Sequence, residues 1–517
     1  MRTNNVLLLT AAINGLLAVS SIQPAAAATA KEKDEKIELL ERRLLLLEQR
    51  LEAAERSAKA PVPVPASAPA SDATIQALDQ KVKILERKNE VDKEIAAEAA
   101  KTAPKFEAGP KGVIFSSADG NNSVRLRASV QADGRFFVDD ESKVKDRFEL
   151  KQARIWVEGR LWKYFDYKIM PDFGANQTIL ADAYVDVHYF PFASLNVGKQ
   201  KTPISLERLQ GDSDGTFMER AYPTYLASNR DVGVKLHGSF ARPGDKVQYA
   251  GPIDFKNFFT YEVGVFNGGG DNGASDSDKE NEDNKEVAAR LWAHPFQNSG
   301  NKVLDGLGVG VAGSWEVPNN NKTSVKSLKS ALGQNTLVDY TKVGTGATEV
   351  AADGEHYRIY PQAYWYYGPY GLLGEYVLSS QQLTGDGGNT HIQQDNTAWQ
   401  IQASYVVTGE NNTFQSVKPR SPFDPFNGQW GALQLAARWS ELSIDEDTFK
   451  PVNGVQLLNP SNSIREASSW ALGANWFLNQ NTRLMADYEN THFTGGARNG
   501  GDRPAENVFS TRLQLVF

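Results

Sequence analysis

The chain has 517 residues, a formal net charge of -8 at neutral pH and no cysteine. The acidic balance argues against a nucleic-acid-binding protein, which usually carries a surplus of basic residues. The lack of cysteine excludes disulfide bonds, thiolate metal sites and a cysteine nucleophile. Beyond the N-terminal stretch, no apolar run reaches the roughly 18 residues that a membrane-spanning helix requires, which argues against a helical membrane protein.

The first 28 residues have the layout of a secretory signal peptide. Arg2 precedes an apolar stretch at 6–19, a run of small residues follows at 25–30, and an A-x-A cleavage site is expected to end at Ala28. An uncleaved membrane anchor is the alternative, although Asn14 and Gly15 interrupt the apolar stretch. We therefore expect residues 1–28 to be removed on export.

A helical coiled-coil segment is predicted at residues 29–60. Apolar side chains from Ile37 to Ala58 recur at alternating steps of three and four, which is typical of an a and d seam. Because about three heptads form only a marginal isolated helix in water, the pattern favours self-association. An amphipathic helix lying on its own domain is the alternative.

A linker rich in proline and alanine follows at residues 61–73, where alternating proline favours an extended, semi-rigid spacer. A second helical coiled-coil segment is predicted at 74–103, with an apolar seam from Ile75 to Leu85. Asn89 falls at the next a position, where a polar residue can fix the register and the number of chains.

From residue 111 to 517 the pattern of polar and apolar residues changes to a period of two, which indicates half-buried strands. The stretch 124–131 alternates in this way, and so does 399–405. A water-soluble β-sandwich would also alternate. Pro171 and Pro361 lie within strand-like runs and are interpreted as strand ends or bulges.

Three further features favour a membrane barrel over a sandwich. The polar faces carry full charges on many of the predicted strands. Aromatic residues gather at predicted strand ends, which is typical of the girdles at the two membrane interfaces; these clusters are at 161–167, 188–192, 255–262 and 364–370. The connections divide into short turns and long polar loops, such as 267–286 and 317–355, as expected for periplasmic turns and extracellular loops.

The last stretch of the chain alternates as far as Phe517. Phe509 and Leu513 fall on one face, and Arg512 and Gln514 fall on the other. Because lipid cannot hydrogen-bond an open sheet edge, we expect this strand to pair with the first strand of a closed barrel of about 14 to 18 strands. An even strand number places both ends of the barrel on one side, so the coiled coil is expected in the periplasm.

Several stretches resemble the phosphate-selective porin O and P family of Gram-negative outer membranes. The most specific is "LNVGKQKTPISLERLQGDSDGTFMERAYPTYL" at 195–226, followed by 229–238, and segments 153–174 and 470–493 are also similar. The resemblance implies a trimeric porin whose pore is narrowed by a long inward-folded loop. The expected fold is thus an all-β transmembrane β-barrel of about 16 antiparallel strands with an N-terminal α-helical coiled-coil segment.

Phosphate selectivity requires cationic side chains that replace water around the anion. The candidate pore-lining cations come from the inward faces of the strands and from the signature stretch; they are Arg125, Arg127, Arg154, Lys199, Lys201, Arg208, Arg220, Arg230, Lys235 and Arg290. Arg125, Arg127, Lys199 and Lys201 are favoured.

A structural role stays open for each candidate cation. Inward-facing acids nearly balance the inward-facing cations, so a salt bridge within the wall is the alternative to contact with a substrate. In the signature stretch, Glu207, Glu219 and Asp231 lie directly beside candidate cations.

The pattern predicts a passive outer-membrane porin for small anions such as phosphate or polyphosphate. A general or other-anion porin on the same scaffold is one alternative, and a structural tether to the cell wall through the periplasmic coiled coil is another. The expected partners are inorganic phosphate or other small anions, outer-membrane lipid and further copies of the chain in a homotrimer. No enzymatic motif, cofactor or metal site is predicted. No nucleic acid is expected as a partner.

Overall fold

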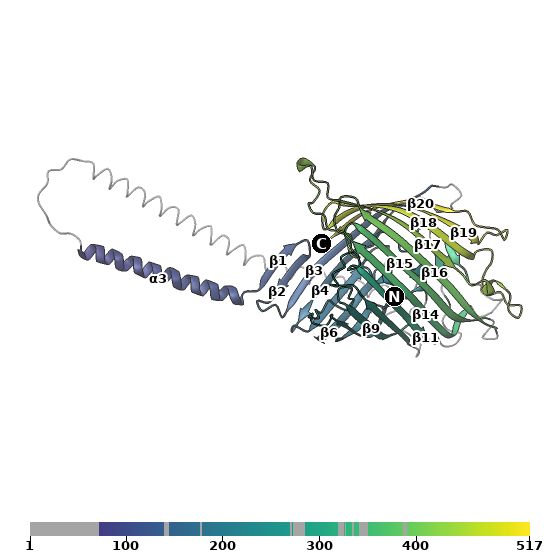
Figure 1. Cartoon of the computed structure of the whole chain (residues 1–517), viewed down its shortest axis with the longest axis horizontal. Helices are drawn as coiled ribbons and strands as arrows, with labels where there is room; N and C mark the ends of the chain where they lie inside the picture. The colour runs from purple at the N-terminus through teal and green to yellow at the C-terminus, as the bar shows by residue number, and fades with distance from the viewer. Residues whose placement is uncertain are drawn as a thin grey trace, which may run out of the picture. The chain divides into compact units, whose positions relative to one another are not determined.

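The computed structural model describes a helix and a large sheet (Figure 1). The residues it describes are 72–138, 144–175, 178–268, 271, 285–318, 325, 327–332, 335–340, 350–385 and 390–517. The chain divides into two units, Met1–Ile95 and Ala96–Phe517. The predicted signal peptide at 1–28, the first coiled-coil segment at 29–60 and most of the linker lie outside the described residues.

The second predicted helical segment is a helix, α3 (Asp72–Thr102), which begins inside the predicted linker. Along the single chain the seam residues Val82 and Leu85 are exposed, and so is Asn89. Within the part of the chain that the structure describes, no helix is both long and apolar enough to cross a membrane.

The sheet of 18 strands contains a closed antiparallel barrel of 16, which confirms the β-barrel part of the predicted fold. In chain order the barrel strands are β3 (Ser123–Phe137), β4 (Arg147–Leu161), β5 (Phe165–Asp172), β6 (Ile179–Phe190), β7 (Ala193–Lys201), β8 (Arg230–Phe240), β9 (Phe259–Phe266), β10 (Glu286–Ala293), β11 (Leu307–Glu316), β14 (Ala351–Tyr367), β15 (Tyr370–Gly385), β16 (Thr390–Val406), β17 (Ala432–Ser443), β18 (Ile464–Phe477), β19 (Thr482–Gly495) and β20 (Glu506–Val516). Each strand pairs with its neighbours along the chain, and β20 pairs with β3.

The closing seam follows the predicted alternation. Leu513 of β20 pairs with Ala132 of β3, and Arg512 pairs with Asp133. Leu513 is exposed on the outer face, whereas Arg512 is buried on the inner face. The seam ends where the Phe517 backbone N–H donates to the carbonyl oxygen of Ala128 at 3.0 Å.

A hairpin precedes the barrel and extends its sheet. It consists of β1 (Lys105–Gly109) and β2 (Gly112–Ser116), and β2 pairs with the first part of β3 on the edge that β20 leaves open. The sheet therefore begins at Lys105, whereas the sequence pattern placed its start at 111.

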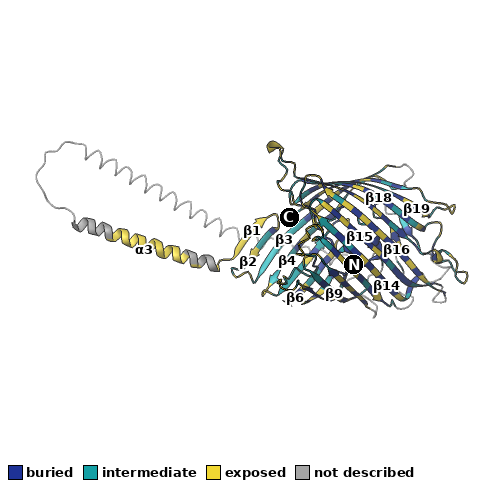
Figure 2. Cartoon of the chain, viewed as in Figure 1, coloured by how far each residue is buried: buried dark blue, intermediate teal, exposed yellow. Residues whose placement is uncertain are grey.

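Apolar side chains cover the outside of the barrel. Exposed and buried residues alternate along the strands (Figure 2), and the exposed ones include Val130, Ile155, Ile169, Val185 and Val234. A water-soluble monomer rarely exposes so much contiguous apolar surface, whereas a lipid-facing wall requires it.

The connections lie on two rims, because neighbouring strands are antiparallel. The rim at which β3 begins and β20 ends, here called the terminal rim, has short turns such as 162–164 and 368–369. It also carries long connections at 241–258 and 407–431, so the expectation of brief turns on this side is only partly correct. The opposite rim has the inward-folded connection 202–229.

Short elements occur within the connections of both rims. They are α4 (Leu206–Leu209), η1 (Tyr222–Leu226), β12 (Leu328–Lys329), β13 (Thr336–Val338), η3 (Pro425–Asn427) and η4 (Glu446–Phe449).

Aromatic residues near the terminal rim follow the predicted girdle in part. Trp162, Phe190 and Tyr370 are exposed on the outside, but Tyr364 is buried. The structure agrees with the sequence interpretation for only one of the two prolines in strand-like runs.

Pro171 lies at a register shift of β5, as predicted. Pro361 pairs with Val311 in regular register inside β14, so its assignment to a strand end or bulge is wrong.

The Asp133–Arg512 ion pair is expected to stabilise the closing seam. Both oxygens of Asp133 accept from Arg512 at 2.7 Å, and both residues are buried. Asp133→Ala leaves the guanidinium charge buried without this partner, which typically costs about 3–5 kcal/mol of unfolding free energy. Urea unfolding in detergent, followed by tryptophan fluorescence, measures the loss. The control, Asp447→Ala, breaks the exposed pair with Lys450 and is expected to have little effect; equal losses would contradict the prediction.

Candidate functional site

The connection 202–229 folds into the lumen, as the family resemblance implied. Its helix α4 begins where Glu375 of β15 accepts hydrogen bonds from the Leu206 backbone N–H at 2.8 Å and from Ser205 Oγ at 3.1 Å. On η1, the Leu226 carbonyl oxygen accepts from the Tyr360 hydroxyl at 2.7 Å. These bonds hold the connection, here called the lumen loop, against β14 and β15.

A pocket of about 260 Å³ remains between the lumen loop and the wall. Strands β3 to β8 supply most of that wall, and residues 209 and 211–214 of the loop face it. Its basic lining residues are Arg127, Arg154, Lys168, Lys201, Arg230 and Lys235, and its acidic ones are Asp182, Asp212 and Asp214. Since the basic residues outnumber the acidic ones, this lumen pocket suits an anion better than a cation.

Asp212 of the lumen loop lies among arginines from three different segments. Its carboxylate accepts hydrogen bonds from Arg154, Arg220 and, at 3.3 Å, Arg230. Burial alone would raise the pKa of Asp212, but these guanidinium groups outweigh burial and hold the pKa well below its usual range. The pocket therefore already binds one oxyanion, which belongs to the chain itself.

Most of the remaining charge is paired within the wall. Asp182 accepts from Arg230 at 2.7 Å and lies 2.9 Å from Lys168 Nζ. Lys235 pairs with Glu262 at 2.6 Å. These pairs agree with the alternative interpretation of the sequence, in which inward-facing charges form salt bridges within the wall.

Arg127 differs from its neighbours. Its Nη1 lies 3.8 Å from Glu158, and its guanidinium lies 4.7 Å from the centre of the Trp156 ring. Across the described ranges, its side chain makes no hydrogen bond, and Nε is buried and unpaired. Arg127 therefore has unused donors at the edge of the lumen pocket.

The predicted cations lie in different parts of the barrel. Arg127, Arg154, Lys201, Arg230 and Lys235 line the lumen pocket. Arg220 reaches it through Asp212.

Three others contact protein groups elsewhere. Arg125 pairs with Glu158 at 3.2 Å, and Arg208 donates to the Thr224 carbonyl oxygen at 2.6 Å within the lumen loop. Arg290 pairs with Glu262 at 2.9 Å.

Lys199 requires a correction, because the sequence pattern placed it in the pore. It pairs in regular register with Ala183 of β6 and Val232 of β8, and it lies two residues after the exposed Val197. Side chains two apart on a strand share a face. The backbone register therefore places Lys199 on the outer face of the barrel.

Asp212 and Lys168 are two charged pocket residues that the candidate list lacked. Lys168 alternates with the exposed Ile169 along β5, and this period of two was the signal available. Asp212 lies in the run "GDSDG", which has no period that could predict its direction. Its position follows from the fold of the whole lumen loop.

The barrel and its charged lumen define a porin, a class of channel and not of enzyme. The family model described as phosphate-selective porin O and P matches residues 124–517, and the chain belongs to this family. Membership places the barrel in an outer membrane.

Individual proteins are more distantly similar. Porin O of Pseudomonas aeruginosa is 26% identical over 160 residues, which are 30% of this chain; the chain therefore spans 33% of the length of that relative. The trimer form of OmpT, an outer membrane protein of Vibrio cholerae, is 13% identical with a TM-score of 0.45, over 77% of this chain and 99% of that chain. An anion-selective porin from Comamonas acidovorans is 12% identical with a TM-score of 0.44, over 77% of this chain and 100% of that one.

Removing the Asp212 charge is expected to strengthen anion binding in the lumen pocket. In Asp212→Asn, Arg154, Arg220 and Arg230 lose the carboxylate that they share, so a permeating anion meets less competition. A charge pair is worth several kcal/mol at an effective dielectric constant of about 20, so anion affinity should rise about tenfold or more. Reversal potentials in a salt gradient should also shift further towards anions.

The matched control is Asp245→Asn, which removes the same charge from the exposed turn 241–258. Reversal potentials that respond equally to both variants, or only to Asp245→Asn, would contradict the role assigned to Asp212.

Proposed function

We propose that this porin conducts small anions through the lumen pocket and that the pocket binds phosphate. The unused donors of Arg127 in a predominantly basic pocket carry this proposal. A guanidinium group can offer paired donors to a phosphate oxygen, and such charge-assisted hydrogen bonds are among the stronger ones in proteins.

The neighbouring ion pairs support conduction as well as binding. A pore must hold an ion well enough to admit it and weakly enough to release it. Asp182 and Asp212 offset part of the charge of Arg154, Lys168 and Arg230, which limits how tightly an anion can be held. Because the positive charge is partly offset, a porin that accepts a wider range of anions is the competing function. Chloride or organic acids would then pass as readily as phosphate.

The exposed seam of α3 favours a second role, in assembly. We propose that residues 29–60 and 74–103 form coiled coils with other copies of the chain in a homotrimer, with this segment in the periplasm. Val82 and Leu85 are exposed in the single chain, and burying an a and d seam between chains would stabilise the helices. Deleting residues 29–103 should then reduce the trimer fraction in detergent while leaving the barrel folded. A trimer fraction that is unchanged would instead favour a tether to the cell wall.

Single-channel conductance tests the phosphate proposal. Phosphate titrated into a chloride solution should block the chloride current, and Arg127→Gln should weaken that block about tenfold, since hydrogen bonds to charged groups contribute about 1.5–3 kcal/mol. Lys199→Met removes one positive charge from the outer face and should leave the block unchanged.

Each result has a distinct meaning. A chloride current that ignores phosphate while the channel stays anion-selective would overturn phosphate binding and favour the broader porin. An unchanged block in Arg127→Gln would remove Arg127 from the site.

A further inference from the structure

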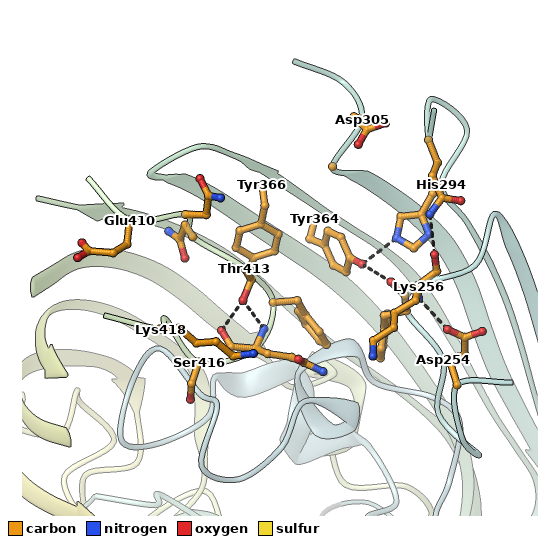
Figure 3. A pocket seen from close by; sticks show the side chains of 18 of the residues that line it. Asp254, Lys256, His294, Asp305, Tyr364, Tyr366, Glu410, Thr413, Ser416 and Lys418 are labelled. Carbon is orange, nitrogen blue, oxygen red and sulfur yellow. Dashed lines mark hydrogen bonds between the residues drawn. The ribbon is translucent and has the colours of Figure 1, made fainter. Parts of the chain in front are cut away.

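A second cavity lies near the terminal rim, apart from the lumen pocket. It has a volume of about 730 Å³, within the range of small-molecule sites. The connections 241–258, 294–306 and 407–431 enclose it together with the end of β14 (Figure 3). We call it the rim cavity.

The floor of the rim cavity is aromatic. The ring centres of Phe255 and Phe414 lie 4.5 Å apart, those of Tyr364 and Phe414 lie 5.0 Å apart, and those of Tyr364 and Tyr366 lie 5.2 Å apart. These rings come from separate connections and from β14, so the floor is built by the tertiary fold. Contiguous ring faces and edges offer a flat ligand an apolar contact area.

Polar atoms within the floor are already bonded. His294 Nδ1 donates to the Asn257 carbonyl oxygen at 2.8 Å, so neutral His294 presents Nε2 as an acceptor to the Tyr364 hydroxyl at 2.8 Å. Burial lowers the pKa of His294, which favours this neutral form. The floor therefore offers ring surface more than hydrogen-bonding groups.

The acidic side chains that line the rim cavity accept hydrogen bonds from residues of their own connections. Asp254 accepts from the Lys256 backbone N–H at 2.7 Å, and Asp305 accepts from the Asn298 backbone N–H at 2.6 Å. Glu410 accepts from Thr408 Oγ1.

Two lysines that line the rim cavity differ from these acidic side chains. In the region the structure describes, no group bonds or pairs with the ammonium of Lys256 or Lys418, and both side chains are exposed. In the view of Figure 3, Tyr364 and Tyr366 lie between Lys418 on one side and Lys256 on the other. The cavity thus combines an aromatic floor with available positive charge.

We propose that the rim cavity binds organic anions that carry an aromatic ring, with the ring on the aromatic floor and the carboxylate at Lys256 or Lys418. This rests on the proposed anion conduction, because Ile253 lines both the rim cavity and the lumen pocket. The two cavities therefore adjoin at this residue. The class of substrate is then broader than inorganic phosphate and includes aromatic carboxylates.

Benzoate is the probe, and acetate is its partner without a ring. Calorimetry on the purified protein in detergent should show saturable benzoate binding and no acetate binding at the same concentrations. The double variant Lys256→Met/Lys418→Met should weaken benzoate binding about tenfold or more. Lys302→Met removes a charge from the connection 294–306 outside the cavity lining and should leave binding unchanged.

A second variant tests the floor independently of charge. Tyr366→Leu shortens the half-buried end of the floor and should weaken benzoate binding while leaving the chloride current intact, which also reports that the barrel is folded. Equal binding of benzoate and acetate, or unchanged benzoate binding in both variants, would overturn the assignment.

Conductance separates the two proposals. An anion-selective channel that binds no benzoate overturns the rim cavity and leaves the anion pore. A cation-selective channel overturns the proposed anion conduction, and with it the path from the rim cavity.

Discussion

The closing of the sheet is the constraint on which the rest of this structure depends. A bilayer offers no hydrogen bonds to an open sheet edge, so β20 must pair with β3 along the seam that ends at Ala128 and Phe517. Closure fixes which face of each strand meets lipid. Alternation then turns the polar face of every strand inward, and the lumen must accommodate all of their charges.

Those charges are accommodated mainly by pairing, as in Asp133 with Arg512 and Lys235 with Glu262. Removing one member of a buried pair is costly, so such pairs are unsuited to exchange with a passing ion. The lumen pocket differs because its cations exceed its acids and because Asp212 comes from the lumen loop. In Arg127 it also holds a cation with unused donors. Pairing within the wall is therefore incomplete at the lumen pocket, which is why we propose it as the anion site.

The sequence was informative where a short-range period controls the structure and uninformative where long-range contacts do. Alternation correctly placed Arg512 inside and Leu513 outside. It did not distinguish Lys199 from Lys201, which were both expected in the pore, although only Lys201 lines the lumen pocket. Lys199 still follows the strand and faces outward, whereas Lys201 lies where the chain enters the lumen loop and donates to the Gln210 carbonyl oxygen. The aromatic floor of the rim cavity was likewise hidden, because Tyr364 was interpreted as part of a lipid-facing girdle.

The most direct test of the anion path is to locate a heavy anion in the barrel. Crystals of the protein soaked in bromide would give an anomalous signal at each bound anion. We expect a bromide peak in the lumen pocket beside Arg127, within reach of Lys168 or Lys235. Bromide found only on the outer loops, with no peak in the lumen pocket, would contradict it.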